Sequence, residues 1–313
     1  MANLLPFILN EERDHVKQEI VGRDISVVFD GTTGLGEAMV ILIRYVSDDW
    51  SLVQRMVQVR LLAKSMTGNE IARELINTLS TNYSISSNCV VAAMRDRASV
   101  NNVAMHVLQV VYPLTIDVGC FSHTINLAGE HFNVPTLNEF TRLWVSLFVH
   151  SAKARLAWKD QVGTPIRSFS PTRWWSQWEV MHQLMVSFGD VEPFLTFSRS
   201  DNIAPATVTK LLSIIATKKN ILQIELAAVI DAGKYLVQST YKLEGDGPLA
   251  LECYEIIQAV LTSIQTGHYP NLEAICRMYS GSDQEYERWM KHGLDCVEPC
   301  RTRVLCLYYE WCS

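Results

Sequence analysis

Two aspartates each stand at the end of a run of β-forming residues, and together they have the chemistry to hold a divalent metal. Asp30 closes the run that begins at Ile25, and Asp96 follows the apolar run from Cys89 to Met94. Paired carboxylates at the ends of neighbouring strands present oxygen ligands to a divalent metal, and such an ion can support the cutting of a phosphodiester. If the two strands are neighbours, Asp30 and Asp96 make half of a phosphodiester-cutting site.

Each aspartate also has a plainer interpretation that the sequence leaves open. Asp30 precedes small turn residues and can cap a hairpin through a local hydrogen bond. Asp96 lies between Arg95 and Arg97 at the expected start of a helix, where it can pair with an arginine and favour the helix N-terminus. Adjacent strands would favour the metal interpretation, because both carboxylates would then share one edge of a sheet.

The segments that carry these aspartates predict alternating strands and helices. Strands are expected at residues 25–30, 38–46 and 56–62, and their short connections imply antiparallel hairpins. Thr67 and Glu70 form a capping-box pattern, which predicts that a helix begins there. Its inward face would consist of Ile71, Leu75, Ile76 and Leu79.

A buried parallel strand at 89–94, a helix at 100–111 and a strand at 115–118 follow. This order predicts an α/β fold, an RNase H-like mixed sheet with flanking helices, in which the first strand lies beside the fourth. Asp30 and Asp96 then meet at one edge of the sheet, although 66 positions (96 − 30) separate them. Beyond about residue 121 the sequence predicts helices, and we expect an RNase H-like core at 1–200 and an all-helical block at 201–313.

Cysteine and histidine residues offer further candidates. Cys120 and His123 follow the last expected strand, and they are compatible with a zinc ligand pair, a Cys-His nucleophile, or a buried cysteine beside a histidine at a helix start. A C-terminal group has spacings that match no common zinc pattern and favours a buried helix: His292, Cys296, Cys300, Cys306 and Cys312.

One stretch of the chain is locally basic although the net charge is −6. Residues 151–173 carry 5 Lys and Arg against 1 Asp or Glu, and Lys153 and Arg155 belong to this stretch. Arg173 is the last residue of this stretch, and Trp174 follows it directly. The arginine can hold a phosphate, and the indole can stack on an unpaired base. The plainer interpretation is a solvated helix face followed by tryptophan packing.

Four motifs, in order and spacing, resemble the catalytic core of the hAT superfamily of DNA transposases. They are Phe-Asp-Gly-Thr at 29–32, Arg-Asp-Arg-Ala-Ser-Val-Asn-Asn at 95–102, Cys-Phe-Ser-His at 120–123 and Thr-Arg-Trp at 172–174. The resemblance covers about residues 1–200, and the helical remainder resembles the insertion domain that interrupts the RNase H fold of that family.

The resemblance implies metal-dependent DNA cleavage and strand transfer at transposon ends. Asp30 and Asp96 would be the first two carboxylates of an Asp-Asp-Glu site that binds Mg²⁺ or Mn²⁺. Cys120 and His123 would lie next to that site and belong to the DNA-binding residues. Trp174 would help to accommodate a flipped base, with Arg173 beside it, and Lys153 and Arg155 would also contact DNA.

The sequence departs from the family in two places. No zinc-finger spacing precedes residue 25, and no Ser-Glu-Arg segment that would supply the catalytic glutamate follows the insertion-like block. Tyr286-Glu287-Arg288 has a tyrosine where the family has serine. We therefore expect an incomplete site and a chain that is inactive alone.

Two other functions remain open. The first is a catalytically silent, transposase-derived module that binds DNA or protein. The second is a sugar-kinase or actin-like ATPase, because Asp-Gly-Thr-Thr-Gly at 30–34 resembles the phosphate loop of those proteins. We expect a nuclear or cytoplasmic protein that is not secreted, because the apolar opening segment lacks the basic flank of a signal peptide and no segment reaches membrane-spanning length. A homo-oligomer or a related transposase chain is the expected protein partner.

Overall fold

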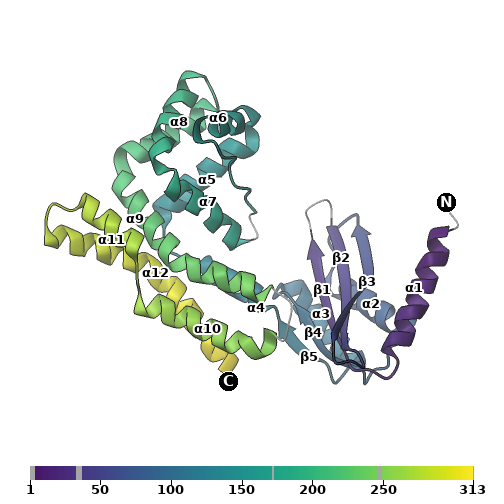
Figure 1. The fold of residues 1–313 in the computed structure, drawn as a ribbon. Coiled ribbons are helices and arrows are strands. Elements are labelled where there is room, and N and C mark those ends of the chain that lie inside the picture. Colours follow the sequence, from purple (N-terminus) through teal and green to yellow (C-terminus); the bar gives the residue numbers. More distant parts are fainter. Residues whose placement is uncertain (1–3, 33–36, 171–172, 245–248, 313) are drawn as a thin grey trace. The chain divides into compact units, whose positions relative to one another are not determined.

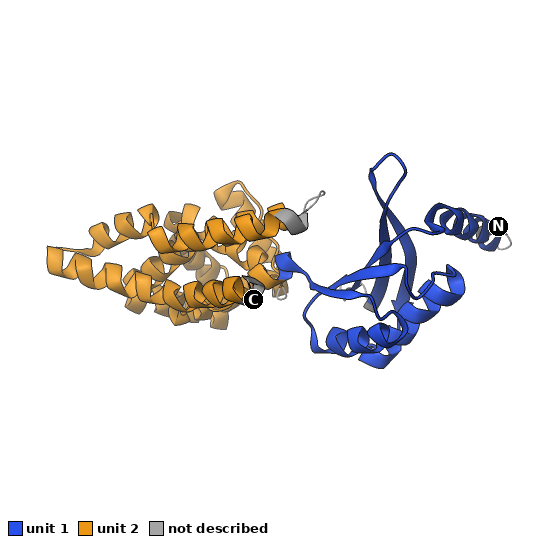
Figure 2. Cartoon of the chain, turned by 90° about the horizontal axis from the view of Figure 1, so that it is seen from below, with its two compact units in different colours: residues 1–123 blue, residues 124–313 orange. Residues whose placement is uncertain are grey.

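The computed structural model describes residues 4–32, 37–170, 173–244 and 249–312. By its internal contacts the chain divides into two compact units, residues 1–123 and 124–313, which Figure 2 shows in separate colours. The predicted boundary near residue 200 thus falls inside the second unit. Each unit is treated by itself below.

The first unit contains a five-stranded sheet (Figure 1). Its strands are β1 Ile25–Thr32, β2 Glu37–Val46, β3 Leu52–Leu62, β4 Val90–Arg95 and β5 Ile116–Gly119, and they lie in the order β3-β2-β1-β4-β5. β1, β2 and β3 pair antiparallel, whereas β4 runs parallel to β1 and β5 runs parallel to β4. The predicted α/β class and the adjacency of the first and fourth strands are confirmed.

Three helices pack with alternate strand residues into one core. They are α1 Leu4–Ile20, α2 Gly68–Ile76, which continues as a π-helix Asn77–Asn82, and α3 Ser99–Val111. Leu79 and Met105 are fully buried in this core together with Val27 and Ile41 of the sheet. The predicted capping box is present, since Thr67 accepts from the backbone N–H of Glu70 and the Glu70 side chain accepts from that of Thr67.

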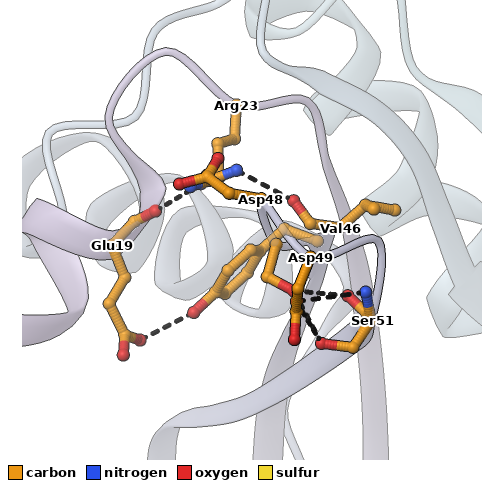
Figure 3. Close-up of polar contacts among 8 residues, drawn as sticks. Glu19, Arg23, Val46, Asp48, Asp49 and Ser51 are labelled. Atoms are coloured by element: carbon orange, nitrogen blue, oxygen red, sulfur yellow. Dashed lines mark hydrogen bonds and ion pairs between the residues drawn. The ribbon is translucent and has the colours of Figure 1, made fainter.

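The helix α1 was not predicted from the sequence. Polar contacts attach its C-terminal end to the hairpin of β2 and β3 (Figure 3). The Glu19 carboxylate accepts from the Tyr45 hydroxyl at 2.6 Å and from Arg55 Nη2 at 2.8 Å. Arg23, just beyond the helix, donates to the Val46 carbonyl at 3.0 Å and pairs with Asp48 at 2.8 Å. The bonds to Arg55 and then Tyr45 lower the pKa of Glu19 to about 2.

The chain is helical from Phe121 onward, as predicted. The helices are α4 Phe121–Gly129, α5 Pro135–His150, α6 Ala152–Val162, α7 Trp174–Val186, α8 Phe188–Ser200, α9 Pro205–Leu243, α10 Leu249–Thr266, α11 Pro270–Tyr279 and α12 Asp283–Cys312. α9 spans 39 residues and packs against α5, α7, α8, α10, α11 and α12. In the described part of the chain no helix is both long and apolar enough to cross a bilayer.

Two buried carboxylates of α9 hold the starts of neighbouring helices. Glu225, 1% exposed, accepts from the backbone N–H of Leu137 at 2.7 Å in the first turn of α5. Asp231, 6% exposed, accepts from the backbone N–H of Leu272 at 3.0 Å and from Asn271 in the first turn of α11. The first helical N–H groups have no partner within their own helix, so a carboxylate from elsewhere can satisfy them.

Candidate functional site

The strand register brings Asp30 and Asp96 to the same end of the sheet. β1 and β4 pair in parallel, and the last aligned residues are Val28 and Met94. Asp30 stands two residues after Val28, inside β1, and Asp96 stands two residues after Met94, directly beyond the end of β4. The parallel register therefore places both aspartates near the end of the sheet where β1 and β4 finish.

Asp30 is exposed at the carboxyl end of β1. The preceding Phe29 is 2% exposed and points into the core, which directs Asp30 to the opposite face. A Cβ built on Gly31 would meet only the carbonyl of Ala38, at 3.9 Å, so the backbone beside Asp30 is open to approach. The turn expected after Asp30 includes Thr33 and Gly34, which lie outside the described residues.

Asp96 is half-buried and takes part in the turn that begins α3. Its Oδ1 accepts from the backbone N–H of Ala98 at 3.0 Å and from the side-chain amide of Asn101. The sequence also allowed a structural role, in which Asp96 pairs with Arg95 or Arg97 at the start of the helix. In the structure the Asp96 carboxylate instead bonds a backbone N–H and a side-chain amide. Both hydrogen bonds end on Oδ1.

Arg95 connects the ends of β4 and β5 and was not predicted to do so. Its side chain is 8% exposed, and Nη2 lies 2.7 Å from the Asp117 carboxylate on β5. Nη1 donates to the carbonyl of Asp96 at 2.9 Å. This cation therefore holds the backbone that carries Asp96, while its charge is balanced by Asp117.

Cys120 and His123 come directly after β5, which runs parallel to β4. The backbone N–H of Cys120 donates to the carbonyl of Arg95 at 2.7 Å, so Cys120 lies beside the residue that precedes Asp96. Cys120 and His123 are both half-buried, and His123 stands in the first turn of α4. Within residues 4–32, 37–170, 173–244 and 249–312, no three His, Cys, Asp or Glu side chains come together as a metal-binding group.

Trp174 begins α7 in the second unit and is 4% exposed. Its ring stacks on Phe132 with centroids 5.4 Å apart. Glycines make room for it, because a Cβ on Gly129 would lie 2.0 Å from the ring and one on Gly233 would lie 2.6 Å from it. The ring is thus held in place by close backbone contacts, and its predicted part in accommodating a base stays a prediction.

Trp174 also borders a cavity of about 350 Å³. Phe132, Phe169 and Met181 give this cavity apolar walls, and Asn138, Arg142 and Gln177 add polar groups. Thr141 lines it too, and the Thr141 hydroxyl is buried without a hydrogen-bond partner in the described structure. Sequence reasoning found Trp174 but not the cavity, because its other walls come from distant helices.

The predicted DNA-contacting cations all have protein partners. Arg173 lies 3.3 Å from the Glu244 carboxylate, and Lys153 lies 2.8 Å from that of Asp201. Arg155 donates to the carbonyls of Phe148 and Val149, at the end of α5. Side chains that bond the last carbonyls of a helix stabilise its C-terminus, so Arg155 has a structural role besides any contact with DNA.

Comparison of the sequence with models of known protein families and with curated proteins found no match.

Proposed function

We propose that this chain is a transposase-derived, hAT-like protein whose first unit is an RNase H-like core that binds a divalent cation at Asp30 and Asp96. The observation that carries this proposal is the parallel pairing of β1 and β4, since Asp30 lies near the carboxyl end of β1 and Asp96 directly follows β4. The strand order β3-β2-β1-β4-β5 supports it, because an RNase H-like sheet has three antiparallel strands followed by parallel ones.

The donor groups fit a hard cation such as Mg²⁺ or Mn²⁺. Asp30 is exposed at the strand end, and the hydrogen bonds of Asp96 occupy Oδ1, which leaves Oδ2 as the oxygen that would face the ion. When bound, the ion would activate water or a 3′-hydroxyl for attack on a phosphodiester. The protein itself supplies orientation, since Asn101 and Ala98 fix the Asp96 carboxylate and Arg95 fixes its backbone.

The expected substrate is DNA, with transposon ends as the family resemblance implies, and the expected compartment is the nucleus. The Trp174 cavity supports a DNA-related function, because aromatic walls with a few amide and guanidinium groups suit an unstacked base. The expected reaction is cleavage and strand transfer once a third carboxylate completes the site. Alone, the chain is expected to bind the cation and DNA without cutting.

A second candidate is a DNA-binding or protein-binding module that never cuts. What favours it is that Asp96 already serves the start of α3 through its bonds to Ala98 and Asn101, a role that needs no metal. The two candidates differ in cation binding. The module predicts no dependence of Mn²⁺ binding on Asp30 and Asp96, whereas the transposase core predicts that binding requires both.

Calorimetric titration with Mn²⁺ separates the candidates. The wild type should bind weakly, and an Asp30→Asn, Asp96→Asn double variant should lose that heat. Asp24→Asn is the matched control, because Asp24 is exposed one residue before the opposite end of β1. Equal heats for the wild type and the double variant would refute the proposal.

A further inference from the structure

A second, larger cavity of the helical unit lies between α7, α9 and the start of α11 and has a volume of about 490 Å³. That volume lies within the range of about 300 to 1,000 Å³ that is usual for small-molecule sites. Its floor is apolar, with Ile230 and Val237 of α9. All the residues that line it belong to the second unit.

Flat aromatic surfaces line one side of this cavity. Trp178 and His182, one turn apart on α7, stack with centroids 5.1 Å apart and an angle of 22° between their rings. The Trp178 indole N–H donates to the Val229 carbonyl at 3.3 Å, and Tyr241 donates its hydroxyl to Glu179 at 2.9 Å. These bonds fix the rings before any ligand arrives, which lowers the entropic cost of binding.

Cationic and amide groups line the other side. Lys234 brings an ammonium group and His268 an imidazole, and Gln238 and Asn271 offer donors and acceptors. The one carboxylate among the lining residues, Asp231, is buried and accepts from Asn271 and from the start of α11. Its oxygens are therefore engaged within the protein, whereas the Lys234 side chain is exposed.

We propose that this cavity binds a nucleoside phosphate, with the base stacked on the Trp178 and His182 wall and the phosphate beside Lys234. Fixed aromatic faces, amides that can read base edges and an exposed ammonium group match the three parts of such a ligand. The inference is independent of the function proposed above, since it uses no residue of the first unit.

Nucleoside monophosphates are the probe, and full-length protein is the sample. In calorimetric titrations at low salt, each of the four ribonucleoside monophosphates is compared with its nucleoside and with inorganic phosphate. We expect the monophosphate to bind at least about tenfold more tightly than either part, because each part fills only half of the site. In ligand-observed NMR, saturation should pass from the protein to the base protons.

Lys234→Met is the decisive variant. It should weaken monophosphate binding about tenfold and leave nucleoside binding unchanged. Lys210→Met is the matched control, an exposed lysine near the other end of α9, and should behave as the wild type. Circular dichroism confirms the fold of each variant, and Trp178→Phe, which keeps a ring but shortens the wall, should weaken the nucleoside as well.

Three results would overturn the inference. The first is the absence of monophosphate binding, and the second is equal affinity for Lys234→Met and Lys210→Met. The third is binding of a single-stranded oligonucleotide without binding of the free monophosphate, which would assign the cavity to a strand instead. The Asp30→Asn, Asp96→Asn double variant should bind the monophosphate like the wild type. The proposed cation site and the proposed nucleotide cavity can therefore fail independently.

Discussion

The carboxylates of the two units differ in what surrounds them. Glu225 and Asp231 of the helical unit are almost completely buried, and each holds the start of another helix. Asp30 is exposed, and Asp96 is half-buried at the end of a strand. A buried carboxylate bonded to backbone N–H groups serves the fold, whereas carboxylates at the ends of neighbouring strands are the kind of group that holds a divalent cation. The difference predicts where substitution changes stability and where it changes binding.

The largest effect on stability is expected at Asp231. Asp231→Ala removes the acceptor of the Leu272 N–H and of Asn271, and leaves buried donors unpaired. The free energy of unfolding should fall by about 3 kcal/mol, measured by urea denaturation. Asp231→Asn keeps an acceptor and should cost about 1 kcal/mol.

Asp295→Ala serves as the control for Asp231, because Asp295 is exposed on α12. It should change the free energy of unfolding by no more than about 0.5 kcal/mol. Equal losses at positions 231 and 295 would show that the helix start is not what Asp231 stabilises.

An intermediate effect is expected at Glu19, which joins α1 to the hairpin. Its pKa is lowered to about 2 from an ordinary value of 4.5, first by the bond from Arg55 and then by that from Tyr45. The folded state therefore binds the proton less readily than the unfolded chain. Its contribution to stability is present above pH 4.5 and is lost as the pH falls toward 2.

Glu19→Gln should lower the free energy of unfolding at pH 7 by about 1 kcal/mol, a value that allows for partial exposure to solvent. The variant should also lose less stability than the wild type on acidification. Glu12→Gln, an exposed position on the same helix, is the control. A wild type and a Glu19 variant with parallel acid denaturation curves would contradict this account.

Glu225 and Asp231 should show the opposite dependence on pH. Burial raises the pKa of each above the ordinary values of 4.5 and 3.8, so the folded state keeps protons that the unfolded chain has lost. Stability from these groups is greatest below the ordinary values and falls as the pH rises through the raised ones. In a Glu225→Gln, Asp231→Asn double variant, the free energy of unfolding should decline less as the pH rises from about 4, the ordinary range of carboxyl groups. Urea denaturation at a series of pH values measures this slope. An unchanged slope would count against the buried-carboxylate account.

The smallest effect on stability is expected at Asp30. Because its side chain is exposed, Asp30→Asn should change the free energy of unfolding by no more than about 0.5 kcal/mol while abolishing Mn²⁺ binding. Thermal denaturation without Mn²⁺ measures the change in stability, and the rise in melting temperature on adding Mn²⁺ measures binding. A variant that unfolds much more easily without metal would place Asp30 among the structural carboxylates instead.

The sheet could be predicted because its signals are local. Alternating apolar residues marked the strands, and the Thr67 and Glu70 pattern marked the start of α2. Short connections required antiparallel pairing, and the intervening helix allowed the parallel return to β1. The adjacency of β1 and β4, which carry Asp30 and lead to Asp96, followed from that order. α1 was missed because its apolar opening was judged only as a signal or membrane segment.

The buried carboxylates of α9 were missed because their partners are distant in sequence. Glu225 bonds a backbone N–H 88 positions away. A signal was nevertheless present, since α5 and α11 begin after Val134 and Tyr269, residues that make no side-chain cap, and each has a proline in its first turn. A helix start that lacks a local cap needs an acceptor from elsewhere, and a carboxylate within a mostly apolar stretch, such as residues 221–233 of α9, is the natural candidate.

The prolines of the helical unit occupy different helix positions. Pro135 and Pro205 do begin helices, because a first-turn proline sacrifices no helical hydrogen bond. Pro193, in contrast, lies inside α8. Packing of Phe194 and Leu195 into the core keeps that helix continuous despite the missing N–H.

Iron-directed backbone cleavage tests the central claim most directly. Fe²⁺ takes the place of the divalent cation, and ascorbate with peroxide generates hydroxyl radicals that cut the chain next to the bound ion. The account predicts two clusters of cuts, around residues 30 and 96, that excess Mg²⁺ suppresses and that the Asp30→Asn, Asp96→Asn double variant lacks. Cuts at only one of these places, or the same cuts in the double variant, would contradict a shared cation between β1 and β4.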